Sequence, residues 1–281
     1  MSFDLKRPFF FATMAAFLFM TGGLAHADIA VPWQMDFQTP MSPVMEQVVE
    51  FHNLLLVIIT VITLFVLALL LYVAIKFNEK ANPTPSKTTH NSVLEVLWTV
   101  VPIIILVIVA VPSFKLLYFQ DRHPNPDMTL KVIGHQWYWS YQYPDHGEFE
   151  FDSVLVPEDE LKEGQPRLLA VDNEVVLPIN TNIRILHTSD DVIHAWAVPA
   201  LIQKFDSMPG RTNENWMRIN QEGTYYGQCS ELCGVNHGFM PIAVKAVSKA
   251  AFAAWVVKAK VEFAKIEDDP TVKVAQASDA R

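Results

Sequence analysis

Two long apolar runs constrain this sequence more than any other feature. The first run, 54–75, is almost entirely Leu, Ile and Val, and no charged residue lies between His52 and Lys76. As a helix these 22 residues extend about 33 Å, which is enough to cross the hydrocarbon layer of a bilayer. We therefore predict a transmembrane helix over about 53–76.

The second run, 96–114, is also free of charge and lies between Glu95 and Lys115. It contains two prolines, which a membrane helix tolerates when neighbouring groups satisfy the freed carbonyls. Its 19 residues predict a second span over about 95–115, and the two spans together predict a helical hairpin.

The connection between the spans indicates how the hairpin is oriented. It carries Lys76, Lys80 and Lys87 against Glu79 before the second span begins. Because short cytoplasmic loops are enriched in Lys and Arg, this connection is predicted to face the cytoplasm. The segment before the first span and everything after the second span are then predicted to lie outside.

The N-terminus has the features of a signal peptide. Lys6 and Arg7 precede the apolar run 8–20, and Ala25-His26-Ala27 matches an A-x-A cleavage signature. We predict that residues 1–27 are removed on export, because a retained membrane anchor needs a longer apolar run. Both the cleaved signal peptide and the basic connection therefore predict that the N-terminal segment lies outside the cytoplasm.

After the second span the helical pattern gives way to short strands. Segments rich in aromatic and β-branched residues and bounded by turn residues predict strands over 129–143, 148–156, 175–186 and 242–247. About 130 residues are enough for one packed all-β domain, a sandwich or a small barrel. The chain thus divides into an N-terminal segment with the hairpin, 28–120, the β-domain, 121–250, and a C-terminal helix to about Ile266 with a polar tail, 251–281.

The predicted β-domain is acidic. It holds 18 acidic and 10 basic residues, a formal net charge of −8. Nucleic acid and anionic lipid are therefore poor partners, whereas a cationic protein is attracted to such a surface. Acidity also keeps an exported domain soluble, and composition alone leaves both interpretations open.

One short segment of the β-domain gathers metal-binding side chains. Within residues 229–240 the chain places Cys229, Cys233, His237 and Met240. Thiolate, imidazole and thioether groups are soft or borderline donors that suit copper rather than Mg²⁺ or Ca²⁺. Two cysteines that bridge two coppers spread one electron over both metals, which limits the change of geometry on electron transfer.

Segment 229–240 holds one histidine, whereas electron-transfer copper sites of the His₂Cys type use two. A second imidazole therefore has to come from another part of the chain. His194, which follows a predicted strand and precedes an aromatic-rich turn, is the best candidate. His187 competes with it, but the strand alternation that begins at Ile183 favours a place for His187 on a strand face.

Two other interpretations of these side chains compete with copper. Exported cysteines usually pair, but a disulfide between Cys229 and Cys233 leaves His237 and Met240 unexplained. Zinc binds Cys and His, but the Met argues against it because a thioether is a rare zinc donor. Copper is therefore the favoured interpretation.

Taken together, these segments resemble cytochrome c oxidase subunit II. The resemblance rests on the hairpin, on Gly-His-Gln-Trp-Tyr-Trp-Ser-Tyr at 134–141, on 191–199 and on the cysteine segment 225–234. It covers about 45–247, and the signal peptide makes it similar to a bacterial version. It implies a cupredoxin-like Greek-key fold for the outer domain, placed on the periplasmic side of a bacterial inner membrane.

The resemblance also implies a binuclear copper centre called CuA. The implied ligands are the bridging Cys229 and Cys233, the capping His194 and His237, the weak axial Met240 and the backbone carbonyl of Glu231. The side chain of Glu231 is implied to reach a Mg²⁺ shared with subunit I.

Further residues take roles from the same resemblance. Trp137 matches the exposed tryptophan through which cytochrome c passes its electron, whereas Trp139 is expected in the core. Glu95 matches a carboxylate at the mouth of a proton path, although a Glu at a helix start also suits the helix dipole. The acids that match the docking area for cytochrome c are Asp145, Glu148, Asp152 and Asp191.

The implied function is respiratory electron transfer by a subunit of an enzyme. Cytochrome c is expected to dock on the acidic face, and electrons to reach haem in subunit I, where oxygen is reduced to water and protons are pumped. A subunit III is a further expected partner. The alternatives are a copper-free quinol oxidase subunit, a copper-delivery protein and a nitrous oxide reductase-like domain. The complete ligand set argues against a copper-free subunit. A copper-delivery protein is expected to carry exposed Met- or His-rich stretches, whereas this site has aromatic residues beside it. A nitrous oxide reductase-like protein needs a much larger catalytic domain in the same chain.

Overall fold

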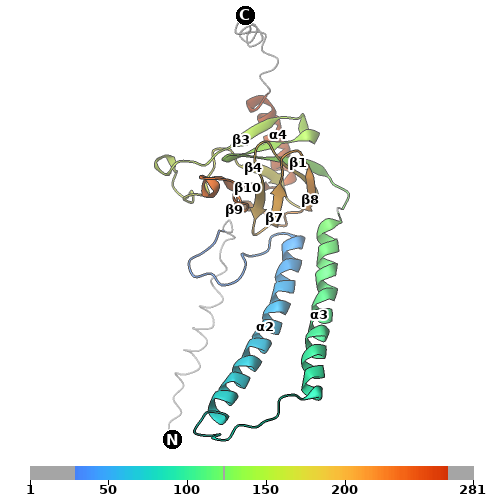
Figure 1. Cartoon of the computed structure of the whole chain (residues 1–281). Helices are drawn as coiled ribbons and strands as arrows, with labels where there is room; N and C mark the ends of the chain where they lie inside the picture. The colour runs from blue at the N-terminus through green and yellow to red at the C-terminus, as the bar shows by residue number, and fades with distance from the viewer. Residues whose placement is uncertain (1–28, 123, 265–281) are drawn as a thin grey trace, which may run out of the picture.

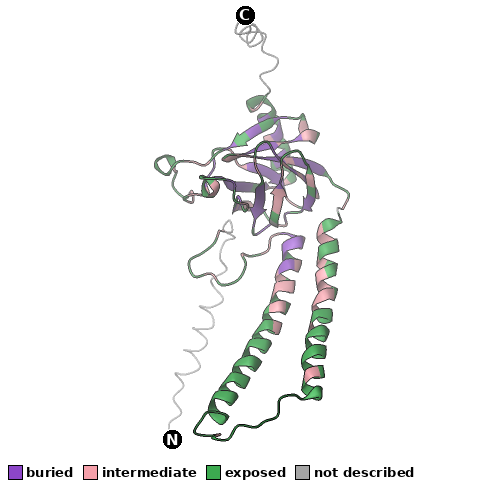
Figure 2. Ribbon diagram, viewed as in Figure 1, coloured by how far each residue is buried: buried purple, intermediate pink, exposed green. Residues whose placement is uncertain are grey.

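The computed structural model describes residues 29–122 and 124–264 of the protein. Two long helices lie side by side and carry a β-rich domain at one end (Figure 1). Most of the helical surface is exposed, whereas the interior of the β-domain is buried, as Figure 2 shows. The predicted fold class, a helical hairpin with an all-β outer domain, is therefore confirmed.

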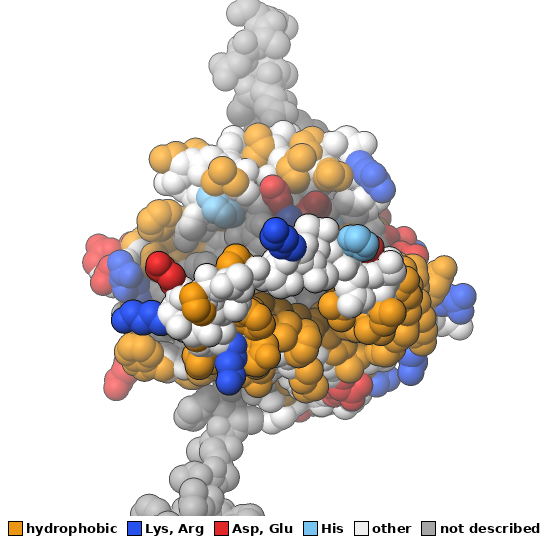
Figure 3. Space-filling model, turned by 60° about the horizontal axis from the view of Figure 1, so that its bottom comes forward, with side chains coloured by type: hydrophobic (Ala, Val, Ile, Leu, Met, Phe, Trp, Pro, Cys, Tyr) orange, Lys and Arg blue, Asp and Glu red, His pale blue; other side chains and the backbone are white. Residues whose placement is uncertain are grey.

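Both helices begin at a capping residue and are longer than the predicted spans. Helix α2 (Pro43–Lys76) begins after Ser42, and helix α3 (Ser92–Asp121) begins after Asn91. Each capping side chain accepts a hydrogen bond from an amide of the first helical turn, which has no partner within the helix. Both helices are long and apolar enough to cross a membrane, and hydrophobic side chains gather over them in Figure 3.

The additional helical turns attach the hairpin to the β-domain. At the start of α2, the Met41 amide donates to the Ala200 carbonyl at 2.8 Å. At the end of α3, the Trp216 indole donates to the Phe119 carbonyl at 3.2 Å. The buried side chains of α2 are Val44, Met45 and Val48.

The β-domain contains two larger sheets and a two-stranded ribbon. In spatial order, the five-stranded sheet consists of β3 (Glu150–Ser153), β2 (Tyr138–Gln142), β1 (Met128–His135), β5 (Ile183–Ser189) and β8 (Asn213–Met217). The three-stranded sheet consists of β4 (Val175–Pro178), β10 (Pro241–Val247) and β9 (Gly223–Gln228), and the ribbon of β6 (His194–Val198) and β7 (Ile202–Ser207). Because β1 runs parallel to β5 and β4 runs parallel to β10, segments distant in sequence become neighbours.

Several strand boundaries differ from the predictions. The predicted strand 129–143 is the hairpin of β1 and β2, with Gln136 and Trp137 at its turn. The predicted strand 175–186 is two strands, β4 and β5, which belong to different sheets. The prediction of an aromatic-rich turn after His194 is wrong, because His194 and the residues that follow it form β6, whose residues are all buried. A short strand buried on both faces lacks the alternation of polar and apolar residues on which the prediction relied.

Helix α4 (Lys249–Glu262) packs against the aromatic core of the β-domain. The rings of Phe252 and Trp255 lie 6.4 and 5.2 Å from the ring of Tyr143, which is completely buried. The helix ends before Ile266, where its end was predicted. The predicted signal peptide, 1–27, and the predicted polar tail after Ile266 lie outside the described residues, and both stay predictions.

Candidate metal centre

The candidate ligands come together because a pair of strands closes the segment that carries them. Residues 229–240, here called the metal loop, connect β9 to β10. These strands are antiparallel and pair Gln228 with Pro241, so the two ends of the metal loop are adjacent. The Cys229 amide donates to the Met240 carbonyl at 3.4 Å and closes the loop at its base.

Three donors of the metal loop surround the sulfur of Cys233. Its Sγ lies 3.8 Å from Cys229 Sγ, 3.5 Å from His237 Nδ1 and 3.5 Å from Met240 Sδ. Both cysteines are free thiols, and their separation far exceeds the S–S bond of about 2.05 Å in a disulfide. The structure therefore shows a cluster of separate donors.

The second imidazole comes from the two-stranded ribbon. His194 is completely buried at the start of β6, and its Nδ1 lies 3.8 Å from Cys229 Sγ. The ribbon is joined to the metal loop by a 2.9 Å hydrogen bond from the Ser230 amide to the Ala195 carbonyl. His187 instead lies on β5 and bonds Asn215, so the structure brings His194, and not His187, to the cysteines.

The spacing of these donors fits four-coordinate metal ions. With metal–sulfur and metal–nitrogen distances of about 2.3 and 2.0 Å, tetrahedral geometry separates two sulfurs by about 3.8 Å and a sulfur from a nitrogen by about 3.5 Å. The observed separations are 3.8 Å between the two cysteine sulfurs, and 3.5 and 3.8 Å between a cysteine sulfur and Nδ1 of a histidine. The soft donors in this cluster fit copper.

The surroundings of the two thiols shift their pKa values in opposite directions. Burial raises the pKa of Cys229, but hydrogen bonds from His194 and the backbone outweigh it and lower the pKa to about 7. Burial and the neighbouring Cys229 thiolate raise the pKa of Cys233. Because metals bind thiolates, metal binding at this pair releases the thiol protons that remain.

Glu231 has separate roles for its backbone and its side chain. Its carbonyl oxygen lies 3.3 Å from Cys229 Sγ. Its carboxylate forms an ion pair with Lys204, which also lies 3.2 Å from a carboxylate oxygen of Asp206. A role of this carboxylate in Mg²⁺ binding stays a prediction.

Two tryptophans of the β1–β2 hairpin contact the metal loop. The Trp137 indole donates to the Cys233 carbonyl at 3.3 Å and is partly exposed. Trp139 is completely buried, as expected, and its indole donates to the Met240 carbonyl at 3.3 Å. Of the two, Trp137 is therefore the one that a partner protein can reach.

The four predicted docking acids do not form one cluster. Asp191 bonds His194, and Asp152 accepts a 2.5 Å hydrogen bond from Ser140, three residues after Trp137. Asp145 and Glu148 follow the far end of β2, where Asp145 bonds the Thr129 amide. Thr129 is six residues before His135 on β1, which corresponds to roughly 20 Å along a strand.

Glu95 is distant from all of these groups. It lies in the first turn of α3, at the end of the hairpin opposite the β-domain (Figure 1). Its carboxylate accepts a hydrogen bond from the Asn91 amide at 3.3 Å and so helps to cap the helix. The proton-path role predicted for it stays a prediction.

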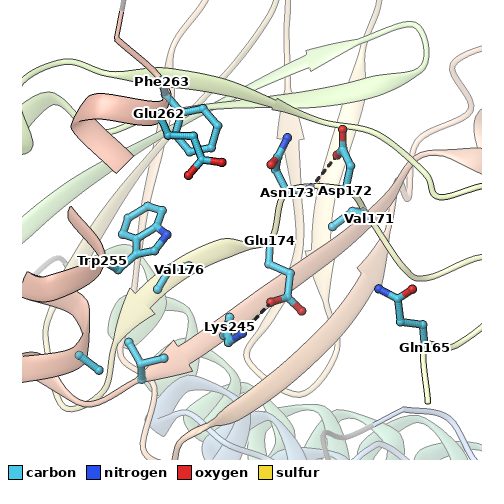
Figure 4. Close-up of a pocket in the computed structure, with 12 residues that line it drawn as sticks. Gln165, Val171, Asp172, Asn173, Glu174, Val176, Lys245, Trp255, Glu262 and Phe263 are labelled. Atoms are coloured by element: carbon cyan, nitrogen blue, oxygen red, sulfur yellow. Dashed lines mark hydrogen bonds and ion pairs between the residues drawn. The ribbon is translucent and has the colours of Figure 1, made fainter. Parts of the chain in front are cut away.

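A groove of about 540 Å³ between α4 and the three-stranded sheet contains no residue of the metal loop (Figure 4). Trp255 and Phe263 line it on one side, and Glu174 pairs with Lys245 at 3.3 Å on the other. Because neither Cys nor His is among the described residues that line this groove, it offers none of the donors that copper prefers.

Sequence analysis missed residues that hold the ligands in place. A Cβ atom at Gly134 would lie 2.7 Å from His194 Cδ2, so this position leaves room only for Gly. A Gly inside an aromatic strand was a signal of such a close approach. The Gln136 side chain donates to the Cys233 carbonyl at 2.7 Å, and no sequence pattern indicated this contact.

Comparison with known proteins gives the same assignment for most of the chain. The family descriptions "Cytochrome C oxidase subunit II, transmembrane domain" and "Cytochrome C oxidase subunit II, periplasmic domain" match residues 30–116 and 128–247.

Individual relatives agree with these matches. The probable cytochrome c oxidase subunit 2 of Rickettsia bellii is 54% identical over 85% of this chain and 89% of its own length. Cytochrome c oxidase subunit 2 of Phytophthora megasperma is 50% identical over 84% of this chain and 90% of its own length. The crystal structure of the periplasmic domain of subunit II of cytochrome oxidase from Bradyrhizobium japonicum is 53% identical, with a TM-score of 0.48, over 51% of this chain and all of that one. On the family matches and the full-length relatives, this chain belongs to the cytochrome c oxidase subunit II family, whose members are part of haem-copper oxidases.

Proposed function

We propose that this subunit accepts electrons from cytochrome c at a binuclear copper centre, CuA, and passes them to haem in subunit I. The observation that carries the proposal is the convergence of free thiol, imidazole and thioether donors 3.5 to 3.8 Å apart. The proposed ligands are Cys229, Cys233, His194, His237, Met240 and the carbonyl of Glu231. Copper bound by these ligands would supply a one-electron couple shared between two ions.

The protein contributes a rigid and largely dry ligand set. Cys229, Cys233 and Met240 are at most 5% exposed, and His194 is completely buried. The buried strand β6 and a hydrogen-bonded loop hold these side chains, so the ligands are expected to stay in place when an electron arrives or leaves. This rigidity favours fast electron transfer over ligand exchange, and so favours an electron carrier over a copper-delivery protein.

Cytochrome c is the proposed donor, and Trp137 is the proposed point at which electrons enter. The Trp137 indole bonds the backbone of a proposed copper ligand, and its ring is partly exposed to a partner. Asp152 and Asp191 lie near it and attract a cationic protein at short range. Asp145 and Glu148 are farther than the Debye length of about 8 Å at physiological ionic strength, so they contribute mainly to long-range attraction.

The remaining roles belong to contacts with other subunits and the membrane. Subunit I is proposed to reduce oxygen and pump protons, with Glu95 at the entrance of a proton path and a subunit III in the same complex. Glu231 is proposed to hold Mg²⁺ at the border with subunit I after it releases Lys204. The basic connection between the helices supports a position in the bacterial inner membrane with the β-domain on the periplasmic side.

Removal of one bridging thiol tests the copper assignment. The purified full chain, reconstituted with copper, is expected to be purple and to show the spin-resonance signal of one electron shared by two coppers. The Cys229→Ser variant is expected to lose that signal because a single sulfur cannot bridge both metals in the same way. The measurement is an optical and spin-resonance spectrum together with the copper content per chain.

The matched control is Ser230→Ala, which removes a neighbouring hydroxyl that donates to the Gln228 carbonyl at 3.2 Å. This control is expected to keep the wild-type spectrum. An unchanged spectrum in Cys229→Ser, or a single copper in the wild type, contradicts the proposed function.

A further inference from the structure

The carboxylate of Asp191 lies between a proposed copper ligand and the turn that carries Trp137. Its Oδ1 accepts hydrogen bonds from His194 Nε2 at 2.8 Å and from the Val192 amide at 2.6 Å. Its Oδ2 accepts a hydrogen bond from the Gln136 amide at 2.6 Å. The Asp191 side chain thus links His194 to Gln136, which lies 55 residues before Asp191 in the sequence.

The first contact fixes the orientation of an imidazole. When Nε2 carries the proton that it donates to Asp191, Nδ1 presents its lone pair, and Nδ1 is the atom that faces Cys229 Sγ. A carboxylate bonded to the remote nitrogen of a metal-binding His fixes the tautomer and the ring orientation in this way. The Asp191 contact therefore selects the form of His194 that can bind a metal.

The second contact fixes the turn between β1 and β2. The Gln136 amide is held by Asp191, while the Gln136 side chain and the Trp137 indole both donate to the Cys233 carbonyl, at 2.7 and 3.3 Å. The turn is thus attached both to Asp191 and to the metal loop. Loss of the Asp191 contact would leave the Gln136 amide without this acceptor, and the turn would then be attached through the metal loop.

We propose that Asp191 is a positioning residue. Its two carboxylate oxygens fix the position of His194 relative to the β1–β2 turn that carries Trp137. This inference rests on the proposed copper function and gives Asp191, beside its proposed attraction for cytochrome c, the role of a structural link within the site. A charge that only attracts a partner needs no such contacts, whereas both oxygens of the Asp191 side chain, which is 32% exposed, accept hydrogen bonds within the site.

The adjacent Asp190 provides a matched control. Its side chain is 69% exposed, and its carboxylate lies 3.8 Å from His135 Nδ1. Asp190→Asn and Asp191→Asn remove the same charge from neighbouring positions, but only Asp191→Asn disturbs the contacts to His194 and Gln136. A role that depends on charge alone predicts the same result for both variants.

The experiment compares these variants in the complete oxidase. Asp191→Asn is expected to alter the copper spectrum and the reduction potential, and to lower the maximal rate of cytochrome c oxidation by about tenfold at every salt concentration, in the range typical for loss of a ligand's hydrogen-bonding partner. Asp190→Asn is expected to keep the spectrum and to raise KM for cytochrome c only at low salt. Asp191→Glu, which keeps a carboxylate at this position, is expected to recover part of the spectral change.

Two different results separate the inference from the function on which it rests. Identical spectra in both Asn variants, with the same salt-dependent rise in KM, overturn the positioning role but leave the copper function in place. A wild-type enzyme without the binuclear copper signal removes the proposed function, and the positioning role falls with it.

Discussion

His187 lies on β5 and His194 on β6, two strands that follow each other in the chain but belong to different sheets. Both side chains are completely buried, but their hydrogen-bond partners differ in chemical type. Nδ1 of His194 faces Cys229, and its Nε2 donates to Asp191. Nε2 of His187 lies 2.9 Å from the amide oxygen of Asn215, and its Nδ1 has no hydrogen-bond partner among the residues that the structure describes. One imidazole lies among groups that can carry charge, and the other lies among neutral groups.

This difference sets the direction of the two pKa shifts. Burial lowers the pKa of His187 to about 4, and the hydrogen bond to Asn215 offsets only part of that effect. Burial also lowers the pKa of His194, but hydrogen bonds to Cys229 and Asp191 outweigh burial and raise the pKa above its usual value. A buried His is therefore a candidate ligand where acidic partners compensate for its desolvation, and a core residue where they do not.

Removal of each imidazole is the most severe test of this comparison. His194→Gln is expected to lower copper affinity by more than about 100-fold, beyond the range typical for loss of a ligand's partner, because a ligand itself is missing. His187→Gln is expected to retain the copper and its spectrum. Copper titration of both variants measures the effect, and equal losses in the two variants would break the distinction between these histidines.

The second test uses the pH dependence of stability. Because the folded pKa of His187 lies below that of the unfolded chain, the neutral form is favoured by folding. Its contribution to stability is complete above about pH 6.5 and is lost as the pH falls toward 4, by about 3 kcal/mol in total. Denaturant unfolding of the full chain in detergent between pH 7 and pH 4 measures this loss.

A double variant separates His187 from the other groups that titrate in the same range. His187→Val combined with Asn215→Leu removes both polar partners together, so neither is left buried without the other. The variant is expected to lose about 3 kcal/mol less stability than the wild type between pH 7 and pH 4. The same pH dependence in both proteins would show that His187 is not buried in the neutral form.

The sequence predicted the parts of the protein whose signal is local. The hairpin follows from apolar runs long enough to cross a bilayer, and the donors at Cys229, Cys233, His237 and Met240 lie close together in sequence. Even here both helices extend beyond the predicted spans. In the added turns of α2, Val44 and Met45 are buried, although they lie outside the predicted span.

The parts that the sequence did not predict depend on contacts between distant segments. The strand β6 was missed because burial on both faces removes the alternation that marks an exposed strand. The separation of Asp145 from Trp137 follows from the length of the β1–β2 hairpin, and the pairing of Lys204 with Glu231 joins positions 27 residues apart. Composition showed that these acids exist, but only the fold shows which of them lie near the metal loop.

Gly134 offers the mildest way to sharpen the comparison, because it borders His194 and leaves His187 untouched. In Gly134→Ala the new methyl group would lie 2.7 Å from His194 Cδ2, so the imidazole or the strand has to shift. We expect a loss of about 2 kcal/mol of stability, typical of overpacking a filled core, and a shifted copper spectrum. Gly238→Ala is the control, since a Cβ atom there meets no atom within 4 Å although it lies in the metal loop itself. Melting curves and spectra of the two variants measure the difference. If both variants match the wild type, the His194 ring has more freedom than its contacts imply, and the rigidity on which fast electron transfer depends must come from the metal loop alone.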